Sequence, residues 1–285
     1  MKSLYQSESK KKEILKLYDK KLIELQIDFS YKTIATSFGE TNIIICGNAA
    51  KPPLVLVHGS NGCAPIALET YPLIYKDFHV FAIDVLAQPN KSAETRLSMK
   101  DNSYGIWIHE VLTSLELKNV TMAGFSFGGL IILKTLINSE ENIKEVFLSV
   151  PAFIVNGNPL IAFFKVFIPM KRYIKTKKTK YVQKFLEVVF SENDDFAFEY
   201  LSKVLLYFNM DFTPVPVIKK EDAQSIKTPI TIIAAGKDIM FPGVKMLKRA
   251  VKIFPSLKEA VLLKDSKHVQ SSSDNIKIAR TILNK

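Results

Sequence analysis

A serine near the middle of the chain lies in a setting that favours nucleophilic chemistry. Ser126 is the centre of GFSFG (residues 124–128), which has the form G-x-S-x-G. In this pattern the serine sits on a sharp turn between a strand and a helix, and the small flanking residues let neighbouring backbone pass close by. The apolar stretches 119–124 and 128–138 predict that strand and that helix. We therefore predict that the turn raises the Ser126 hydroxyl clear of a sheet, as a nucleophile requires.

A serine hydroxyl is a weak nucleophile at neutral pH, so it needs a base and a group that orients the base. Of the 4 histidines in the chain, His268 is the one that follows Ser126. It comes just after a predicted strand at 258–264, at the carboxyl end of the sheet, where open α/β folds bind ligands. A serine, acid, histidine order is typical of this architecture. We predict that His268 is the general base.

Three aspartates compete for the role of the orienting acid. Asp238 follows the predicted strand 228–236 and so also falls at a carboxyl end. Asp265 lies three residues before His268, which is close in sequence for a side chain that must reach across the loop, and Asp84 precedes the serine. We predict Asp238 as the acid and keep the other two as alternatives.

An acyl-transfer reaction also needs two backbone N–H donors for the oxyanion of its tetrahedral intermediate. The residue after the nucleophile, Phe127, is expected to supply one donor. The other is expected from Ser60, in the loop HGSNG (58–62) that follows an apolar strand. In that loop we expect His58 to be a structural hydrogen-bonding residue rather than a second base.

The elements that must position these residues alternate between strands and helices. Buried or alternating apolar patterns predict eight strands, and helical periodicity predicts helices between most of them. The strands are 30–38, 41–46, 53–57, 79–84, 119–124, 144–150, 228–236 and 258–264, and the helices are 102–117, 128–138, 243–254 and 274–284. The first two strands form an antiparallel pair that turns at Gly39. The alternation predicts an α/β fold with a mostly parallel central sheet flanked by helices.

The alternation of strands and helices is interrupted once, after the sixth strand. Residues 151–224 show helical patterns and no strand alternation, and they are too long for an ordinary connection. We predict a helical cap at 151–224, inserted in a core made of 1–150 and 225–285. Residues 1–26 of that core contain an amphipathic helix.

Several segments together resemble a known family. LVLVHGSNG, VFAIDVLAQPNKS, VTMAGFSFGG, IIAAGKD and SKHV occur in the order seen in the α/β-hydrolase superfamily, and the chain resembles its capped, single-domain serine hydrolases of the carboxylesterase type. The resemblance implies the α/β-hydrolase fold with a cap over the pocket. It disfavours the dehalogenase and epoxide-hydrolase branches, in which aspartate replaces Ser126. The chain departs from its relatives at 87–89, where Ala-Gln-Pro stands in place of a loop that is often rich in glycine.

These observations predict a serine hydrolase that cleaves an ester of a small or medium acyl group through a Ser-His-Asp triad and an acyl-enzyme. No metal or organic cofactor is expected, because the chain supplies every group the reaction needs. Two alternatives remain open at this point. The same triad could serve a carbon-carbon bond hydrolase or an acyltransferase, or the chain could be a ligand-binding relative without catalytic activity.

The charge and composition narrow the range of partners. A net charge of +11 attracts anions, but no zinc-finger spacing, aromatic RNA-binding signature or arginine-rich tract accompanies it. We therefore predict a small-molecule ester as the partner and no nucleic acid. A homodimer is compatible with the sequence. The lysine-rich stretch 171–180 is expected to be a solvated helix face, the alternative being a basic rim that favours anionic or interfacial substrates.

The cysteines and the apolar segments indicate the compartment. Cys46 and Cys63 have no C-x-x-C or metal-type spacing, which fits a reducing environment. The first fifteen residues lack the apolar segment of a signal peptide. No stretch approaches the roughly 18 uninterrupted apolar residues of a transmembrane helix. We predict a cytoplasmic protein without stable membrane insertion.

Overall fold

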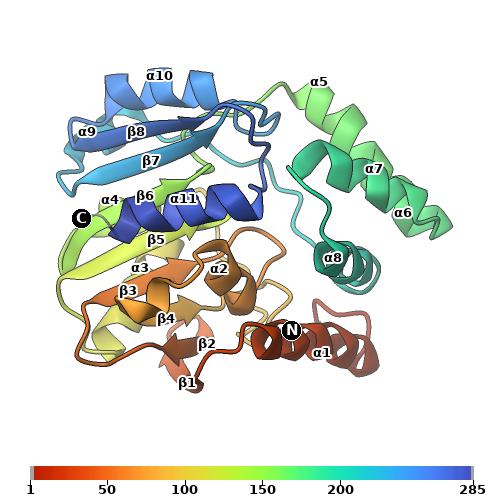
Figure 1. Ribbon diagram of the computed structural model, residues 1–285, viewed down its shortest axis with the longest axis horizontal. Helices are drawn as coiled ribbons and strands as arrows, with labels where there is room; N and C mark the ends of the chain where they lie inside the picture. Colours follow the sequence, from red (N-terminus) through yellow and green to blue (C-terminus); the bar gives the residue numbers. More distant parts are fainter. Residues whose placement is uncertain (1–2, 284–285) are drawn as a thin grey trace.

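A computed structural model describes residues 3–283 and shows one twisted sheet with helices on both faces (Figure 1). Within these residues the sheet has 8 strands in the order β1-β2-β4-β3-β5-β6-β7-β8. Their bounds are β1 Phe29–Thr36, β2 Gly39–Cys46, β3 Pro53–Val57, β4 His79–Ile83, β5 Val120–Phe125, β6 Ile143–Ser149, β7 Ile230–Ala235 and β8 Leu257–Leu263. The pairs β1·β2 and β2·β4 are antiparallel, and the other neighbours are parallel. The predicted fold class is confirmed.

The strand sequences divide the core into two layers, one on each face of the sheet. On β3, Val55 and Val57 belong to one buried cluster, whereas Leu54 and Leu56 belong to the other. Successive side chains of a strand point to opposite faces, so a strand that is covered on both sides must be apolar throughout. This explains why the central strands are continuous apolar runs.

Helices cover both faces of the sheet. The helices in the buried cluster that contains Val55, here called the Val55 layer, are α3 Ser103–Ser114, α4 Phe127–Asn138, α9 Lys220–Ser225 and α10 Gly243–Ile253. Those that pack in the Leu54 layer are α1 Glu8–Glu24, α2 Ala64–Thr70 and α11 Ser272–Leu283. The sequence did not predict α2 or the 3₁₀ turn Ile74–Lys76 that follows it. Both are too short for a helical period to be recognised.

The segment between β6 and β7 is helical, as predicted, and most of it lies at one end of the sheet (Figure 1). It contains α5 Pro159–Ala162, a π-helical turn Phe163–Phe167, α6 Ile168–Thr176, α7 Lys180–Val189 and α8 Asp195–Tyr207. Helix α8 packs against α1, and the two are joined by an ion pair between Lys20 and Glu199 (3.7 Å). Helix α9, by contrast, contacts α4 and α10 of the core. The division into core and cap stays a prediction.

Within residues 3–283, no helix combines the length and the apolar character that a bilayer-spanning segment needs.

His58 joins the ends of two neighbouring strands, β3 and β4. Its side chain is buried, Nε2 accepts a hydrogen bond from the Val85 N–H (3.0 Å), and Nδ1 lies 2.7 Å from the Gly59 carbonyl oxygen. These partners require a proton on Nδ1 and none on Nε2, so the native imidazole is neutral. Burial lowers the pKa of His58 to about 4, against 6.5 for the free side chain. His58 is thus a structural residue in this fold.

This buried imidazole predicts a loss of stability in mild acid. Between pH 6.5 and about 4 the His58 imidazole takes up a proton in the unfolded chain but not in the native protein. The stability that the buried neutral imidazole contributes is therefore complete above pH 6.5 and is lost as the pH falls toward 4. A pKa difference of this size corresponds to about 3 kcal/mol of unfolding free energy. The free energy of unfolding is measured with urea at a series of pH values, followed through the fluorescence of Trp107, the single tryptophan, which is buried. Its slope against pH should be present in the wild type and absent in His58→Asn.

The control is His79→Asn, which changes a half-buried imidazole at the start of β4 and should keep most of the slope. Equal slopes for the wild type and His58→Asn would contradict the assignment.

Candidate active site

Ser126 occupies the turn between β5 and α4, as the sequence predicts. Its backbone angles are φ 52° and ψ −111°, a left-handed conformation that costs energy in a residue other than glycine. Three backbone hydrogen bonds hold the turn. The Ser126 N–H donates to the Ser149 carbonyl, and the Ser126 carbonyl accepts from the N–H groups of Gly129 and Ala152, each at 2.9 Å. The strained turn is therefore fixed on both sides by the end of β6.

The glycines around Ser126 allow chain segments to pass almost in contact. A Cβ on Gly128 would lie 2.1 Å from the carbonyl oxygen of Val57, at the end of β3. A Cβ on Gly124 would lie 2.7 Å from the backbone of Gly128. Real Cβ atoms do not approach backbone atoms so closely, so these positions require glycine for space. Helix α4 can begin directly beneath the serine only because both side chains are absent.

The three predicted triad residues lie together at the carboxyl ends of the strands. His268 Nε2 is 2.9 Å from Ser126 Oγ, and His268 Nδ1 is 2.8 Å from Asp238 Oδ2. All three residues are buried. The serine and histidine are 142 positions apart in the chain, so the fold alone brings them into hydrogen-bond contact.

The carboxylate of Asp238 is held as an anion that faces the imidazole. Its Oδ1 accepts hydrogen bonds from the backbone N–H groups of Met240 (2.7 Å) and Phe241 (3.1 Å). Burial by itself would raise the pKa of Asp238, but the His268 imidazole and these two donors outweigh it, so the pKa lies below its ordinary value. A carboxylate fixed in this way would keep a proton on Nδ1 and leave Nε2 free to accept one.

Two aromatic rings flank the imidazole. The ring centroid of Phe125 lies 5.4 Å from that of His268, and the centroid of Phe241 lies 5.5 Å from it. The rings exclude water from the imidazole and restrict its rotation. Phe125 is a variable position of the G-x-S-x-G pattern, and no sequence signal marks Phe241 as part of the site.

The two alternative acids lie elsewhere. Asp265 is largely exposed and pairs with Lys237 (2.8 Å). Asp84 is buried, and its carboxylate accepts hydrogen bonds from the Ala64 N–H (2.7 Å) and the Asn42 side-chain amide (2.8 Å). It therefore ties the start of α2 to β2. Neither residue is the hydrogen-bond partner of His268.

The two predicted oxyanion donors belong to segments that meet at the serine. The loop after β3 passes so close that a Cβ on Gly59 would lie 3.3 Å from the Cβ of Ser126. Ser60 follows Gly59 directly, and Phe127 is the first residue of α4, where helical N–H groups have no partner inside the helix. Within residues 3–283 neither of these two N–H groups donates a hydrogen bond outside regular helix or strand pairing. This arrangement is compatible with the predicted role of the two groups.

The loop that carries His268 is bound to the end of cap helix α7. Val269 forms a parallel bridge with Phe190, and its N–H donates to the Val189 carbonyl (2.9 Å). The Ser191 hydroxyl donates to the Val269 carbonyl (2.8 Å) and accepts from the Lys267 N–H (2.9 Å). No sequence pattern indicated this contact, because Ser191 lies in a polar stretch that resembles any helix end.

The segment 87–89 keeps its turn without glycine. Ala87 adopts a left-handed φ of 55°, the conformation that glycine adopts most easily. Beside it, the Gln88 side-chain oxygen accepts a hydrogen bond from the Asn61 N–H (2.6 Å). Gln88 therefore supports the loop that carries Ser60, which explains how this chain tolerates its departure from the glycine-rich pattern.

A comparison with protein families matches residues 52–199 to the α/β hydrolase fold family. The chain belongs to this family. The matched segment contains the serine turn and the loop with Ser60.

The chain is also similar to individual bacterial carboxylesterases. The "uncharacterized carboxylesterase nap" of Bacillus subtilis (strain 168) is 24% identical over 249 residues, which cover 84% of this chain and 80% of that protein. Carboxylesterase YbfK of the same organism is 27% identical over 135 residues, 47% of this chain and 46% of that protein. Among solved structures, the naproxen esterase (carboxylesterase NP) of B. subtilis superposes with a TM-score of 0.82 at 19% identity, covering 95% of this chain and 96% of that one.

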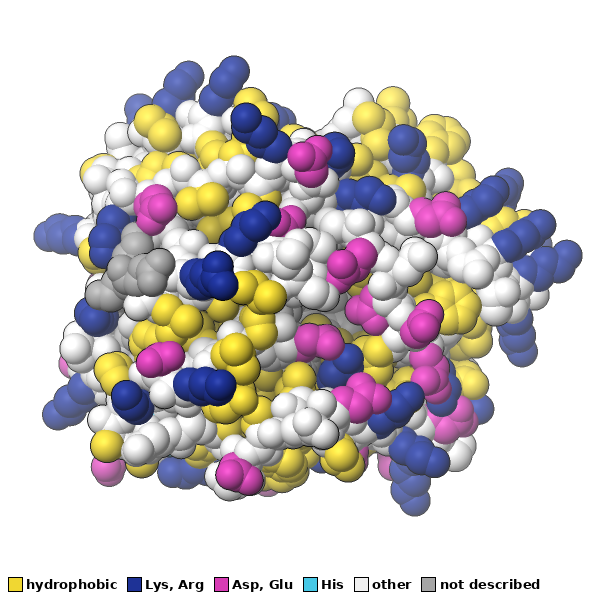
Figure 2. Space-filling model, in the orientation of Figure 1, with side chains coloured by type: hydrophobic (Ala, Val, Ile, Leu, Met, Phe, Trp, Pro, Cys, Tyr) yellow, Lys and Arg dark blue, Asp and Glu magenta, His cyan; other side chains and the backbone are white. Residues whose placement is uncertain are grey.

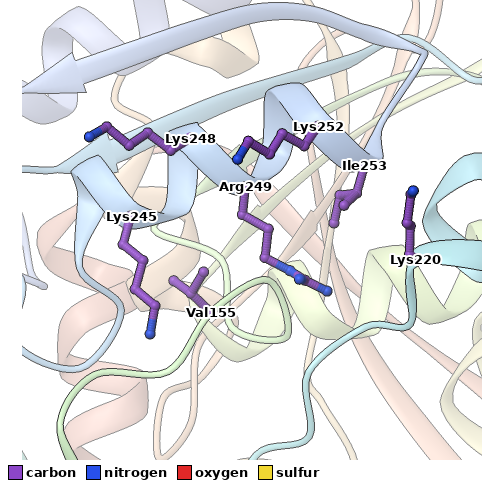
Figure 3. Close-up of a pocket in the computed structure, with 7 residues that line it drawn as sticks. All are labelled: Val155, Lys220, Lys245, Lys248, Arg249, Lys252 and Ile253. Carbon is purple, nitrogen blue, oxygen red and sulfur yellow. The ribbon is translucent and has the colours of Figure 1, made fainter.

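This α/β hydrolase also has a basic hollow that none of the three predicted triad residues lines (Figure 3). The hollow has a volume of about 630 Å³ and is lined mainly by cations. The lining residues are Val155, Lys220, Lys245, Lys248, Arg249, Lys252 and Ile253, most of them on α10. None belongs to the triad. In the described part of the chain, no three His, Cys, Asp or Glu side chains gather in a manner suited to a metal ion.

The close approach at Gly128 predicts a graded loss of stability. In Gly128→Ala the new methyl group meets the backbone of β3 at 2.1 Å, so strand and helix must separate. We expect a loss of about 1–3 kcal/mol in unfolding free energy, as for overpacked cores, despite the better helix propensity of alanine. Gly62→Ala is the matched control, because its Cβ would be 3.1 Å from the nearest atom. The urea midpoint should be highest for the wild type, lower for Gly62→Ala and lowest for Gly128→Ala. A lower midpoint for Gly62→Ala than for Gly128→Ala would refute the argument.

Proposed function

We propose that this protein is a serine carboxylesterase in which Ser126, His268 and Asp238 form the catalytic triad. The observation that carries the proposal is the continuous chain of contacts from Ser126 Oγ through His268 to Asp238, at 2.9 and 2.8 Å. The family membership and the carboxylesterase names of the relatives support it. The proposed substrate is a carboxylic ester with a small or medium acyl group.

In the proposed mechanism, Ser126 Oγ attacks the ester carbonyl carbon while His268 Nε2 takes the hydroxyl proton. The Asp238 carboxylate accepts a hydrogen bond from the other ring N–H and stabilises the imidazolium that forms. The carbonyl oxygen becomes an oxyanion, to which the N–H groups of Phe127 and Ser60 donate. The tetrahedral intermediate then collapses, the imidazolium returns its proton to the leaving alkoxide, and an alcohol departs from the acyl-enzyme. A water molecule repeats the sequence, which releases the carboxylic acid and restores the serine.

We also propose that the protein is cytoplasmic. Both cysteines, Cys46 and Cys63, are buried and unpaired, which a reducing compartment permits. Their burial makes them small apolar core residues rather than reactive thiols.

The catalytic role of Ser126 is tested by Ser126→Ala. Without the nucleophile, turnover of a p-nitrophenyl ester should fall by about four to six orders of magnitude. The wild type should be labelled by a fluorophosphonate probe, and mass spectrometry of the labelled peptide should map the label to Ser126. Ester hydrolysis by Ser126→Ala at the wild-type rate would rule out the proposal.

The same pair of measurements separates the alternatives. A wild-type protein that does not react with the probe would indicate a ligand-binding relative without catalysis. Labelling at Ser126 without ester hydrolysis would favour carbon-carbon bond cleavage or acyl transfer, and product partition between water and an added alcohol would distinguish hydrolysis from transfer.

Ser191 is expected to position His268 without touching the substrate. Ser191→Ala removes the hydroxyl that joins Lys267 to Val269, so the imidazole should sample more orientations. We expect kcat for the ester to fall roughly tenfold, in line with the cost of misplaced catalytic groups, with little change in KM. Ser191→Thr retains a hydroxyl and should restore much of the rate.

The control for this prediction is Ser202→Ala on α8. The Ser202 hydroxyl is buried and has no hydrogen-bond partner within residues 3–283, so its removal should leave kcat unchanged. Equal losses of kcat in Ser191→Ala and Ser202→Ala would show that Ser191 does not position His268.

A further inference from the structure

The part of the cap that lies farthest from α1 exposes large apolar side chains. Leu160 is 66% exposed and Phe164 is 63% exposed, and Ile161, Phe163 and Phe212 are also largely exposed. Four of these five belong to α5 and the π-helical turn that continues it. Exposed apolar clusters of this kind are uncommon in monomeric proteins and mark contact surfaces. Figure 2 shows this apolar surface at the upper right, over α5.

The aromatic rings of this surface are contiguous. Phe163 contacts both Phe164 and Phe167, with ring centroids 5.4 Å apart in each case. Phe167 in turn contacts Phe212, at 5.6 Å. Lys171 extends over this end of the cluster, and its Nζ is 5.0 Å from the Phe212 ring. The surface is thus a single apolar patch with a cation at its border.

The sequence around the patch is strongly and uniformly basic. Between Val146 and Leu186 it contains no Asp or Glu, and eight cations follow the start of α5. They are Lys165, Lys171, Arg172, Lys175, Lys177, Lys178, Lys180 and Lys184. All eight are exposed, and none forms an ion pair with another described residue. Lysine and arginine side chains project at the right-hand edge of Figure 2, where α6 and α7 lie.

We propose that residues 160–180, here called the cap tip, dock on the surface of anionic lipid bilayers. The apolar side chains would enter the boundary between head groups and acyl chains, and the surrounding cations would contact the phosphate groups of acidic lipids. This combination of an apolar face with lysine and arginine is the physical signature of a segment that lies in a membrane interface. Each cation held near such a surface adds to the attraction, and salt screens it.

A bilayer suits this surface better than a second copy of the chain. Two copies that met through their cap tips would bring fourteen cations, seven from each, into one interface without any carboxylate from the same segments. Like charges in contact oppose association. Asp211, the acid next to Phe212, is engaged by the N–H and hydroxyl of Thr213 (2.8 and 2.6 Å). An anionic lipid surface supplies the negative charge that the cap tip lacks.

Vesicle binding tests the proposal independently of catalysis, because Ser126→Ala serves as the parent protein. Its binding to vesicles of phosphatidylcholine with added phosphatidylglycerol is measured by co-sedimentation over a range of lipid and salt concentrations, with pure phosphatidylcholine for comparison. We expect binding to the anionic vesicles alone, weakening as salt rises. A triple variant Lys175→Gln, Lys177→Gln and Lys178→Gln should bind on the order of 100-fold more weakly.

The matched control removes the same charge from another surface. Lys245→Gln, Lys248→Gln and Lys252→Gln change the basic hollow on α10, a helix that lies away from α6 and α7 in Figure 1. Both triple variants carry a net charge of +8, which is +11 less 3. The α10 variant should bind within a fewfold of the parent. Far-UV circular dichroism verifies that each variant is folded.

Leu160→Ser with Phe164→Ser tests the apolar part of the surface. This pair should abolish the binding that survives at high salt while leaving the salt-sensitive part in place. The proposal is overturned if the parent does not bind anionic vesicles or if both triple variants lose affinity equally. It is also overturned if size-exclusion chromatography shows a dimer that Leu160→Ser with Phe164→Ser dissociates, since the patch would then be an interface between copies.

Discussion

Helix α4 and strand β3 approach each other so closely beneath Ser126 that no side chain fits between them. Because Gly128 places its backbone against the Val57 carbonyl, the helix begins immediately below the serine and the serine adopts its left-handed turn. The N–H of Phe127, the first residue of that helix, then lies at the same edge of the sheet as the loop after β3. One packing requirement thus fixes the turn at Ser126 and brings together the two segments that carry the proposed oxyanion donors.

Much of the fold is predictable because central parallel strands are apolar on both faces, and such runs stand out in a sequence. The serine turn is equally visible, since it needs small residues at fixed positions. The triad partners are harder to predict. His268 follows from chain order, but the choice of Asp238 over Asp265 depends on which carboxylate is buried and which faces solvent. Helix α2 is too short to show a period, and the hydroxyl of Ser191 contacts the histidine loop only through tertiary packing.

The cap combines two different surfaces in one continuous segment. Its inner elements pack in the same layer as α1, through buried residues such as Tyr173 and Tyr200. Its outer elements carry unpaired cations and exposed rings, which no packing need within the chain explains. A segment that only covered a pocket would be expected to place its large apolar side chains inward. The segment therefore combines a face that packs on the rest of the chain with a face that we propose as a contact surface.

The attachment of α7 to the histidine loop limits how the cap can move. The backbone bridge between Phe190 and Val269 and the two hydrogen bonds of the Ser191 hydroxyl form a fixed point beside His268, the proposed general base. A rigid-body displacement of α7 would also move the loop of His268 and would break its contact with Ser126. Any movement of α7 that preserves the contact between His268 and Ser126 must therefore leave the bridge between Phe190 and Val269 in place.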